Sequence, residues 1–516
     1  MKPNKHRKKG ILRLIFSRFF LIAVLLVLQV ALVAMVYLQF REKIQILLYV
    51  QWIFTFAMVT YLFNNTMDSS AKLTWMLVIS LLPLPGAALL LFTQSNLGHR
   101  VETRMVKKQI DNTRRLLNQP DNVIKEIQHD GSGTDDICSY LNKSGCFPIY
   151  DKTKVEYFPS GERKFEALMA ELEKAEKYIF LEYFIIEEGY MWNRILETLL
   201  RKAKAGVEVR VLYDGMCEMS TLPINYYKRL EAMGIKAKSF SPMKPVVSSH
   251  YNYRDHRKIL VIDGKVAFNG GVNLADEYMN RVVRFGHWKD AAVMIKGPAV
   301  KSFTLMFLQM WNIGVEPTDY EKWLSLPDVS SDGAAGYVMP YCDSPLDEYK
   351  VGEAVYMDIL NRATDYVHIM SPYLILDGEL ETALCFAAQR GVDVKIILPG
   401  IPDKKVAYAL AKTHYRTLTE AGVKLYEYTP GFVHAKVFVC DDVKAVVGTI
   451  NLDYRSLYHH FECATYLYKA DCIADIERDF RETLSKSKEV TATTIKGEKT
   501  YYKVVGGLAK MISPLM

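Results

Sequence analysis

Three long uncharged stretches dominate the hydrophobic pattern at the start of this chain. They cover residues 19–40, 44–67 and 73–98. Each matches or exceeds the roughly 20 apolar residues that cross a bilayer. The first is too long for a signal peptide and has no small-residue cleavage site. The pattern therefore predicts a membrane anchor of two to three transmembrane helices over residues 1–98.

Basic residues flank this predicted anchor on both sides. Residues 1–18 carry seven Lys or Arg and no acid, and residues 100–115 are also basic. Basic flanks of membrane segments usually stay on the cytoplasmic side, so both flanks of the anchor are expected there. Three complete spans would place them on opposite sides, so one of the three stretches is expected not to cross. Pro83-Leu84-Pro85-Gly86 interrupts the third stretch and predicts a broken or re-entrant helix there. The alternative is three complete spans with one basic end outside.

After a basic linker expected at 99–150, short β-rich runs alternate with helical runs, which is typical of an α/β fold. Three blocks recur along this part of the chain. Residues 178–186 correspond to 366–375, 206–213 to 391–398, and 234–240 to 422–428. A period of about 180 residues is too long for a solenoid. The repeat predicts two related domains, at 151–330 and 331–516.

Charge and cysteine content narrow the function. The formal net charge is +7, and residues 1–18 supply all of this excess, so a broadly basic nucleic-acid-binding surface is not expected. All eight cysteines lie beyond the anchor and none forms a Cys-x-x-Cys pair, so no zinc site of that spacing is predicted. Scattered cysteines fit a reducing compartment. They favour a cytoplasmic location for the predicted domains.

Each repeat contains the same five-residue pattern. His256, Lys258, Asp263, Gly270 and Asn273 recur at identical spacing as His434, Lys436, Asp441, Gly448 and Asn451. The His and Lys are two residues apart, so on a strand they share a face. A hairpin that turns at the motif Asp brings the Asn back beside the His.

His, Lys and Asn on one face form a cradle for a phosphate group. The Lys supplies charge, the Asn supplies a hydrogen-bond donor, and the His can attack phosphorus or donate a proton. Neighbouring His459 and His460 face opposite ways on a strand, which argues against a metal site there. His368 lies in an apolar strand pattern and is expected to be a core or interface histidine.

The paired motifs resemble the phospholipase D superfamily. Residues 181–186 and 451–456, together with the Leu-Leu-Pro-Leu-Pro-Gly segment, resemble bacterial cardiolipin synthases in particular. The resemblance extends from about residue 44 to the C-terminus. It implies two phospholipase D-like domains, each a β-sheet flanked by helices, with the active site at their interface.

The resemblance also implies a phosphatidyl transfer through a phosphohistidine, which converts two phosphatidylglycerol molecules into cardiolipin and glycerol without metal or organic cofactor. It implies His256 as nucleophile and His434 as acid/base, although the symmetric motifs leave this order open. Asp290 and Glu462 occupy the positions of the carboxylates that orient the histidines. Lys258, Lys436, Asn273 and Asn451 would hold the phosphate oxygens, while Asp263 and Asp441 are expected at the turns.

The partners expected on this basis are phosphatidylglycerol and other lipids of the bacterial plasma membrane, with no nucleic acid. Whether the chain forms homo-oligomers stays open. Water as acceptor would instead make the protein a membrane-bound phospholipase D, or a nuclease of that superfamily. A non-enzymatic scaffold would be expected to carry eroded motifs, whereas both copies are complete.

Overall fold

The computed structural model describes residues 27–32, 35, 44–94, 100–113, 116–145, 147–242, 253–316, 319–325 and 331–515. Their contacts divide the chain into two compact units. One consists of Met1–Arg100, Lys244–Tyr251 and Met511–Met516, and the other of Val101–Met243 and Asn252–Lys510. We call them the N-terminal unit and the catalytic-motif unit, because the second contains both copies of the repeated motif.

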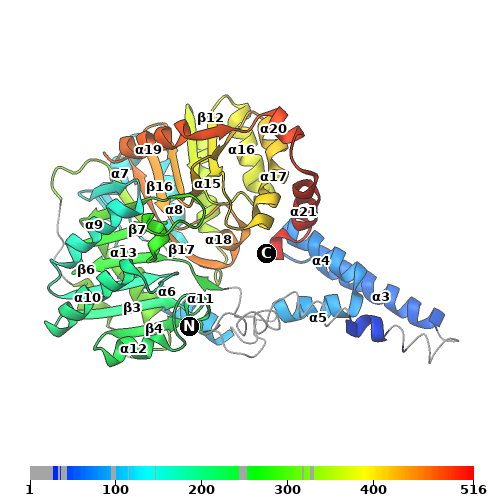
Figure 1. Ribbon diagram of the computed structural model, residues 1–516, viewed down its shortest axis with the longest axis horizontal. Coiled ribbons are helices and arrows are strands. Elements are labelled where there is room, and N and C mark those ends of the chain that lie inside the picture. Colours follow the sequence, from blue (N-terminus) through cyan, green and yellow to red (C-terminus); the bar gives the residue numbers. More distant parts are fainter. Residues whose placement is uncertain are drawn as a thin grey trace, which may run out of the picture. The chain divides into compact units, whose positions relative to one another are not determined.

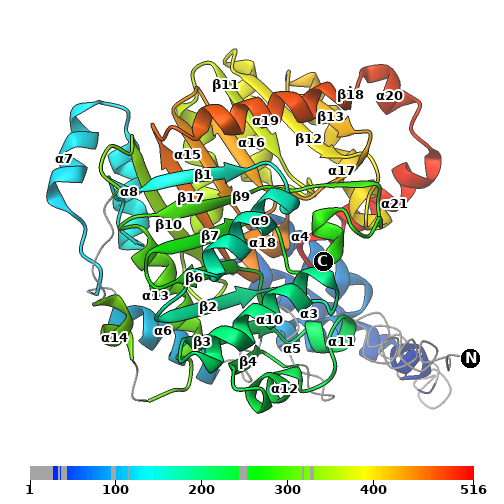
Figure 2. The ribbon, with the colours of Figure 1, turned by 60° about the vertical axis from the view of Figure 1, so that its left-hand side comes forward.

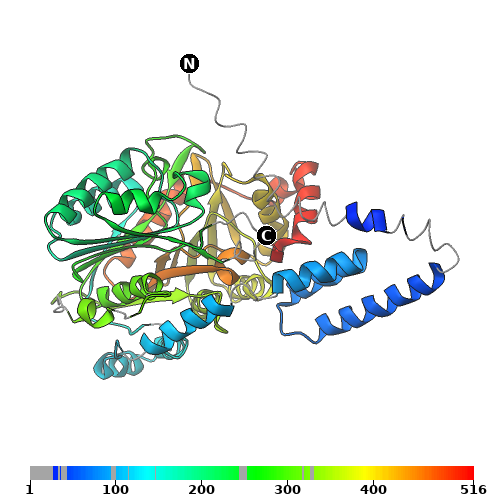
Figure 3. The same cartoon turned by 90° about the horizontal axis from the view of Figure 1, so that it is seen from below.

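The described part of the N-terminal unit includes three apolar helices. They are α3 (Ile44–Phe63), α4 (Ser69–Leu81) and α5 (Pro83–Gln94). Asp68 caps α4 by accepting hydrogen bonds from the N–H groups of Ser70 and Ala71. The chain reverses there, so α3 and α4 run side by side (Figure 3). A small core between the three helices contains Leu62, Trp75, Ile79 and Leu90.

The multi-pass anchor predicted from the sequence is not supported by this unit. None of the helices in the described ranges has the length and apolar character needed to cross a membrane. The third hydrophobic stretch is divided at Leu82, as its prolines predict, because Pro83 cannot donate a backbone hydrogen bond to the preceding turn. The resulting helices have 13 and 12 residues. Most of the first stretch, 19–40, lies outside the described residues.

The catalytic-motif unit contains one large sheet from each repeat. The first has the strand order β1-β9-β7-β6-β2-β3-β4. Along β2, Tyr178 and Phe180 face one core while Ile179 and Leu181 face another, as the two-residue period of a strand requires. Helices α9, α10 and α12 cover the second of these faces (Figure 2). The bounds are β1 (Lys154–Phe158), β2 (Tyr178–Tyr183), β3 (Glu208–Asp214), β4 (Lys236–Phe240), β6 (Lys258–Ile262), β7 (Val266–Gly270), β9 (Ala292–Lys296), α9 (Gly161–Leu172), α10 (Tyr190–Lys204) and α12 (Tyr226–Ala232).

The second sheet repeats this order as β10-β17-β16-β15-β11-β12-β13, with β18 added at the edge. Helices α15, α16 and α17 cover its outer face (Figure 1). The α/β fold class is confirmed, and the two sheets of this single compact unit share one strand order. The bounds are β10 (Tyr337–Asp343), β11 (Tyr366–Met370), β12 (Asp393–Pro399), β13 (Lys424–Tyr428), β15 (Val437–Cys440), β16 (Lys444–Gly448), β17 (His460–Tyr468), β18 (Ser487–Glu489), α15 (Val351–Arg362), α16 (Gly378–Gln389) and α17 (Lys405–Glu420).

The inner faces of the two sheets share one core. Helix α13 (Val300–Trp311) contributes Phe303 and Met306, and α19 (Ile473–Ser485) contributes Phe480. They pack with Val261 of the first sheet and Val439 of the second. This continuous apolar layer joins the two repeats and fixes the junction at which the motifs meet.

The segment expected to be a linker at 99–150 is instead largely helical. It forms α6 (Arg100–Thr113), α7 (Asp121–His129) and α8 (Thr134–Lys143). Val123 and Ile127, four residues apart, are fully buried against the second repeat, as is Leu141. The overall polarity of this segment is typical of a loop, but its few apolar residues have helical spacing. This spacing explains why helices form where a linker was expected.

The remaining described elements are short or peripheral. They are α11 (Cys217–Ser220), η3 (Asp276–Met279), α14 (Tyr320–Leu324), α18 (Tyr454–Tyr458), α20 (Ala492–Lys496), α21 (Thr500–Lys510), η4 (Ser513–Leu515), and the short strands β5 (Arg254–Asp255), β8 (His287–Lys289) and β14 (Gly431–Val433). The last three strands position the histidines.

Candidate active site

Two short strand pairs cross between the repeats and position both motif histidines. Strand β5 pairs with the start of β17, and β14 pairs with β8. At the end of each pair, a histidine N–H donates to a carbonyl of the other repeat. His256 donates to Phe461 at 2.9 Å, and His434 donates to Lys289 at 2.7 Å. This register places each histidine beside the carboxylate that follows the paired residues of the other repeat, Glu462 after Phe461 and Asp290 after Lys289.

Each carboxylate therefore orients the histidine of the other repeat, an arrangement that we call crossed. Nδ1 of His256 lies 2.8 and 2.9 Å from the two carboxylate oxygens of Glu462, which belongs to the other repeat. Nδ1 of His434 lies 2.7 Å from Oδ2 of Asp290. Both carboxylates are completely buried. A carboxylate at Nδ1 holds the proton there and leaves Nε2 with its lone pair.

Burial keeps both imidazoles neutral. It lowers the pKa of His434 to about 4, and the charge of Lys436 acts in the same direction. Burial also lowers the pKa of His256 well below its usual value, against the opposing effect of Glu462. The pKa of Glu462 is lowered even though burial alone would raise it, because the hydrogen bond from His256 favours the carboxylate. A neutral imidazole beside an ionised carboxylate suits nucleophilic attack.

The two motif lysines are buried behind the histidines. Nζ of Lys258 donates to the carbonyl of His256 at 2.6 Å, and Nζ of Lys436 donates to the carbonyl of His434. Burial lowers the pKa of Lys258 to about 8 and that of Lys436 to about 7. The charge of Lys258 also lowers the pKa of His434, so the two motifs share one electrostatic environment. Their contact with a phosphate stays a prediction.

The two motif asparagines differ in their surroundings. Oδ1 of Asn273 accepts from the N–H of Ile185 at 3.0 Å, and its Nδ2 donates to the hydroxyl of Tyr278 at 2.8 Å. The ring of Tyr278 in turn contacts that of His434, with centroids 5.3 Å apart. Asn451 is also buried, but its Oδ1 has no hydrogen-bond partner. The role of either amide in holding phosphate stays a prediction.

Asp263 and Asp441 lie at hairpin turns and bind backbone groups. Both turns contain residues with positive φ, including Asp263 at 54° and Asp441 at 52°. The carboxylate of Asp263 accepts from three consecutive N–H groups, those of residues 176–178, at 2.7 to 2.8 Å. Asp441 accepts in the same way from the N–H groups of residues 364–366. These contacts fix each hairpin to the start of a neighbouring strand.

Sequence reasoning missed one histidine at the site. His460 is buried, and its ring centroid lies 5.4 Å from that of His256. Its Nδ1 is 3.6 Å from Oε1 of Glu462. Ligand atoms of His256, His460 and Glu462 lie within 4.8 Å of one another, which could accommodate a metal ion. The signal was present in the sequence, because residues 460 and 462 share a face of one strand.

Aromatic side chains line the histidines on both sides. Phe184 contacts His256, with ring centroids 4.8 Å apart. Trp288 and Phe432 contact His434 at 5.4 and 5.8 Å. These rings cover one side of each imidazole and exclude water from it.

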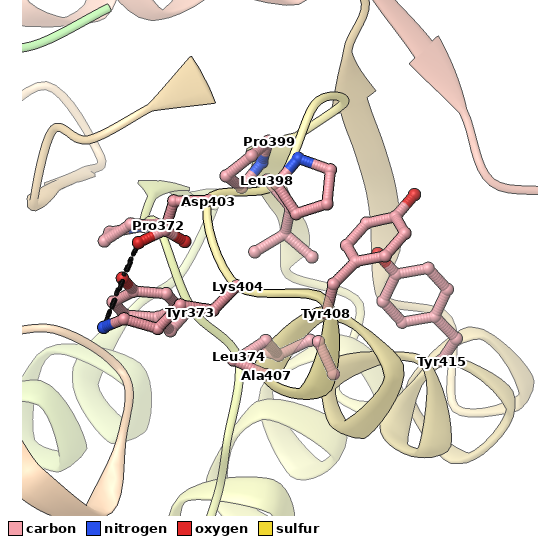
Figure 4. A pocket seen from close by; sticks show the side chains of 12 residues that line it. Pro372, Tyr373, Leu374, Leu398, Pro399, Asp403, Lys404, Ala407, Tyr408 and Tyr415 are labelled. Carbon is pink, nitrogen blue, oxygen red and sulfur yellow. Dashed lines mark hydrogen bonds and ion pairs between the residues drawn. The ribbon is translucent and has the colours of Figure 1, made fainter. Parts of the chain in front are cut away.

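A small pocket lies in the second repeat, where β12 ends and α17 begins (Figure 4). Its apolar lining includes Leu374, Leu398 and Ala407. At one side the hydroxyl of Tyr373 donates to Asp403 at 2.7 Å, and Lys404 donates to that hydroxyl at 3.1 Å. Aspartate and lysine from the same loop thus hold the tyrosine at the edge of the pocket.

Other residues considered in the sequence lie away from these contacts. His368 is buried and pairs with Glu477, whose two oxygens are 2.9 and 3.1 Å from Nδ1. Among the cysteines within the described ranges, seven are free thiols, and Cys146 lies outside those ranges.

The fold and the paired motifs define a phospholipase D-like enzyme. The family described as "Cardiolipin synthase, PLD-like domain" matches residues 168–311 and 356–484, one segment in each repeat. The chain therefore belongs to the cardiolipin synthase family of phospholipase D-like proteins, and it is an enzyme of the phosphatidyltransferase class.

Several relatives cover most of the chain. An uncharacterized protein of Streptococcus mutans serotype c is 57% identical over 458 residues, which are 89% of this chain and 99% of the relative. A cardiolipin synthase of Alkalihalophilus pseudofirmus is 32% identical over 464 residues, 88% of this chain and 91% of the relative. The crystal structure of a phosphatidylserine synthase of Haemophilus influenzae Rd KW20 is 14% identical, with a TM-score of 0.55 over 70% of this chain and 93% of that chain. This last likeness concerns the fold alone.

Proposed function

We propose that the chain is a cardiolipin synthase that transfers a phosphatidyl group between two phosphatidylglycerol molecules through a phosphohistidine. The observation that carries the proposal is the crossed pair of buried His–carboxylate contacts, His256 with Glu462 and His434 with Asp290. Two oriented imidazoles at one junction supply a nucleophile and a proton donor for a two-step displacement at phosphorus.

In the first step, Nε2 of His256 attacks the phosphorus of phosphatidylglycerol. The phosphorus–oxygen bond to the glycerol headgroup breaks, and His434 gives the leaving oxygen its proton. An anionic phosphodiester beside His434 favours the protonated imidazole and raises its pKa, so the low pKa of the histidine alone does not prevent this role. The charged forms of Lys258 and Lys436 would stabilise the phosphate oxygens.

In the second step, a terminal hydroxyl of another phosphatidylglycerol attacks the phosphatidyl-histidine. His434 accepts the hydroxyl proton, the phosphorus–nitrogen bond breaks, and His256 is regenerated. The products are cardiolipin and one glycerol. No metal or organic cofactor takes part in this scheme, since the buried histidine–carboxylate pairs supply both proton transfer and nucleophile.

We also propose that the enzyme acts at the bacterial plasma membrane, with the catalytic-motif unit in the cytoplasm and the N-terminal unit in contact with lipid. Trp52, Phe56 and Phe63 of α3 are each more than 70% exposed, and such rings favour an apolar or interfacial surrounding. Retention of the full chain in membranes washed at high salt and alkaline pH is the expected result. Its release into the wash would contradict attachment through this unit.

The test of the function is product analysis with the full-length protein and vesicles of phosphatidylglycerol. Cardiolipin and free glycerol should appear in about equal amounts, with little phosphatidic acid. Phosphatidic acid without cardiolipin would instead identify a membrane-bound phospholipase D, in which water replaces the lipid hydroxyl.

A further inference from the structure

Two loops of the catalytic-motif unit expose apolar residues among basic ones. In residues 281–286, Val283 is 76% exposed and its neighbour Val282 is 44% exposed, with an arginine on either side of the pair. In residues 400–406, Ile401 and Val406 are 41% and 44% exposed, with Lys404 and Lys405 between them. We call these two segments the rim loops.

The rim loops lie next to each other although they come from different repeats. The first leads directly into β8, and the second is bonded to β14, the partner of β8. The N–H groups of Gly400 and Ile401 both donate to the carbonyl of Gly431 at 3.1 Å. Cδ1 of Ile401 lies 3.1 Å from the position that a Cβ would take at Gly286. The exposed apolar residues of both loops thus belong to one surface.

This surface adjoins the candidate active site. Strands β8 and β14 end directly before Asp290 and His434, which are bonded to each other. Phe285 of the first rim loop contacts Phe432, and Trp288 contacts both Phe432 and His434. These aromatic contacts connect the rim loops to His434.

The charge of the rim loops favours an anionic surface. They carry four basic residues and one acid, Asp403. Arg284 is paired with Glu187 at 2.8 Å and with Glu277 at 3.1 Å, which offsets part of the excess. Lys404 pairs with Asp403 at 3.9 Å and donates to the hydroxyl of Tyr373, which offsets a further part. Lys405 is exposed, and Arg281 lies over the ring of Tyr190. Apolar side chains flanked by long basic ones suit the headgroup boundary, where the apolar parts enter lipid and the charges meet phosphate.

We propose that the rim loops insert into the headgroup region of an anionic bilayer and so deliver membrane phospholipid to the active site. The inference rests on the proposed function, because it gives the lipid substrate a route from the bilayer to His434. Burial of exposed valines in the interface would supply apolar binding energy, and the lysines would add attraction to anionic lipid.

The test compares one substrate in two physical forms, using the full-length protein. The variant V282S/V283S removes the apolar pair of the first rim loop. We expect its rate on phosphatidylglycerol in bilayers to fall by roughly tenfold. Its rate on short-chain phosphatidylglycerol, dissolved as monomers, should stay within about twofold of the parent, since no bilayer contact is needed.

The matched control is F386S, which also removes an exposed apolar side chain. Phe386 is 51% exposed near the end of α16. This end of α16 leads to the start of β12, whereas the second rim loop follows the end of β12, so the two lie at opposite ends of that strand. This variant should keep both rates. A second measurement needs no turnover: amide hydrogen exchange of residues 281–286 should slow in phosphatidylglycerol bilayers relative to phosphatidylcholine bilayers.

The outcomes separate the two proposals. Equal loss of both rates in V282S/V283S, or no loss of either together with unchanged exchange, would overturn the role of the rim loops. If the parent protein made no cardiolipin from either form, the proposed function would fail. Amide hydrogen exchange of residues 281–286 in the two kinds of bilayer would then test membrane insertion independently of enzymatic activity.

Discussion

The crossed orientation of the histidines makes a sharp prediction for Glu462→Gln. Glu462 accepts from Nδ1 of His256 through both oxygens, at 2.8 and 2.9 Å, in a fully buried setting. A hydrogen bond to a charged group contributes about 1.5–3 kcal/mol. At about 1.4 kcal/mol for each tenfold change in rate, its loss from the transition state slows turnover roughly 10- to 100-fold. A neutral amide also lets the imidazole adopt the tautomer that blocks Nε2, which lowers the rate further.

The chain provides a matched control for this variant. Glu477 makes the same two-oxygen contact with Nδ1 of His368, away from the motif residues. We therefore expect Glu477→Gln to keep turnover within about twofold of the parent, because the histidine that it orients does not touch the substrate. Cardiolipin formed from phosphatidylglycerol vesicles is measured for both variants, and thermal unfolding by circular dichroism shows whether each is folded. Comparable rates for the two folded variants would refute the reasoning.

A second substrate separates the nucleophile from the acid. Phosphatidyl-p-nitrophenol has a leaving group that departs without a proton, so its first step needs the nucleophile but not the acid. If His256 attacks and His434 protonates, Asp290→Asn should release p-nitrophenol at close to the parent rate in the first turnover, before the second step needs His434 as a base, while Glu462→Gln should not. The reverse result would exchange the roles of the two histidines.

Three further predictions follow from the same contacts. His256→Ala and His434→Ala should each abolish cardiolipin formation, and the double variant should be no slower than either, because the two act as a unit. Asp263→Ala should lower the free energy of unfolding by about 2–4 kcal/mol through three lost backbone contacts, yet leave the kcat of the folded fraction nearly unchanged. Turnover should fall as pH rises through about 7 and 8, as Lys436 and Lys258, with pKa values of about 7 and 8, lose their charge. In the unfolded chain a lysine stays protonated up to about pH 10.4, so above about pH 8 the unfolded state binds more protons than the folded state. The free energy of unfolding therefore rises with pH in this range. Thermal melts should accordingly show that unfolding does not cause the loss of turnover.

The sequence carried much of the information about each repeat taken alone. The three recurring blocks became equivalent parallel strands, β2-β3-β4 and β11-β12-β13, in sheets of the same order. Both hairpins formed where Asp263 and Asp441 predicted them, since positive φ at a turn leaves a recognisable residue signature. These features depend on local sequence and on periodicity, which a single chain displays directly.

Contacts between the repeats were not predictable in the same way. Asp290 and Glu462 were recognised as orienting carboxylates, but their partners depend on β8 pairing with β14 and β5 with β17. Strand pairs of two or three residues have too little pattern to reveal a partner far away in the chain. The helices of 99–150 were missed for a related reason, because their few apolar residues became meaningful only against the second repeat, for α7 and α8, and against the core shared by the repeats, for α6.

The crossed pairs have a consequence for the repeat itself. Each histidine takes its backbone anchor and its carboxylate from the other copy: His256 from Phe461 and Glu462, and His434 from Lys289 and Asp290. An isolated repeat would therefore contain a histidine whose tautomer is not fixed and a carboxylate without its imidazole. In the assembled unit both carboxylates are fully buried, and a buried charge that lost its partner would destabilise the fold by several kcal/mol. The two histidines and the two carboxylates thus stabilise the association of the two sheets and also build the site. Selection for a stable junction and selection for two oriented imidazoles therefore act on the same contacts.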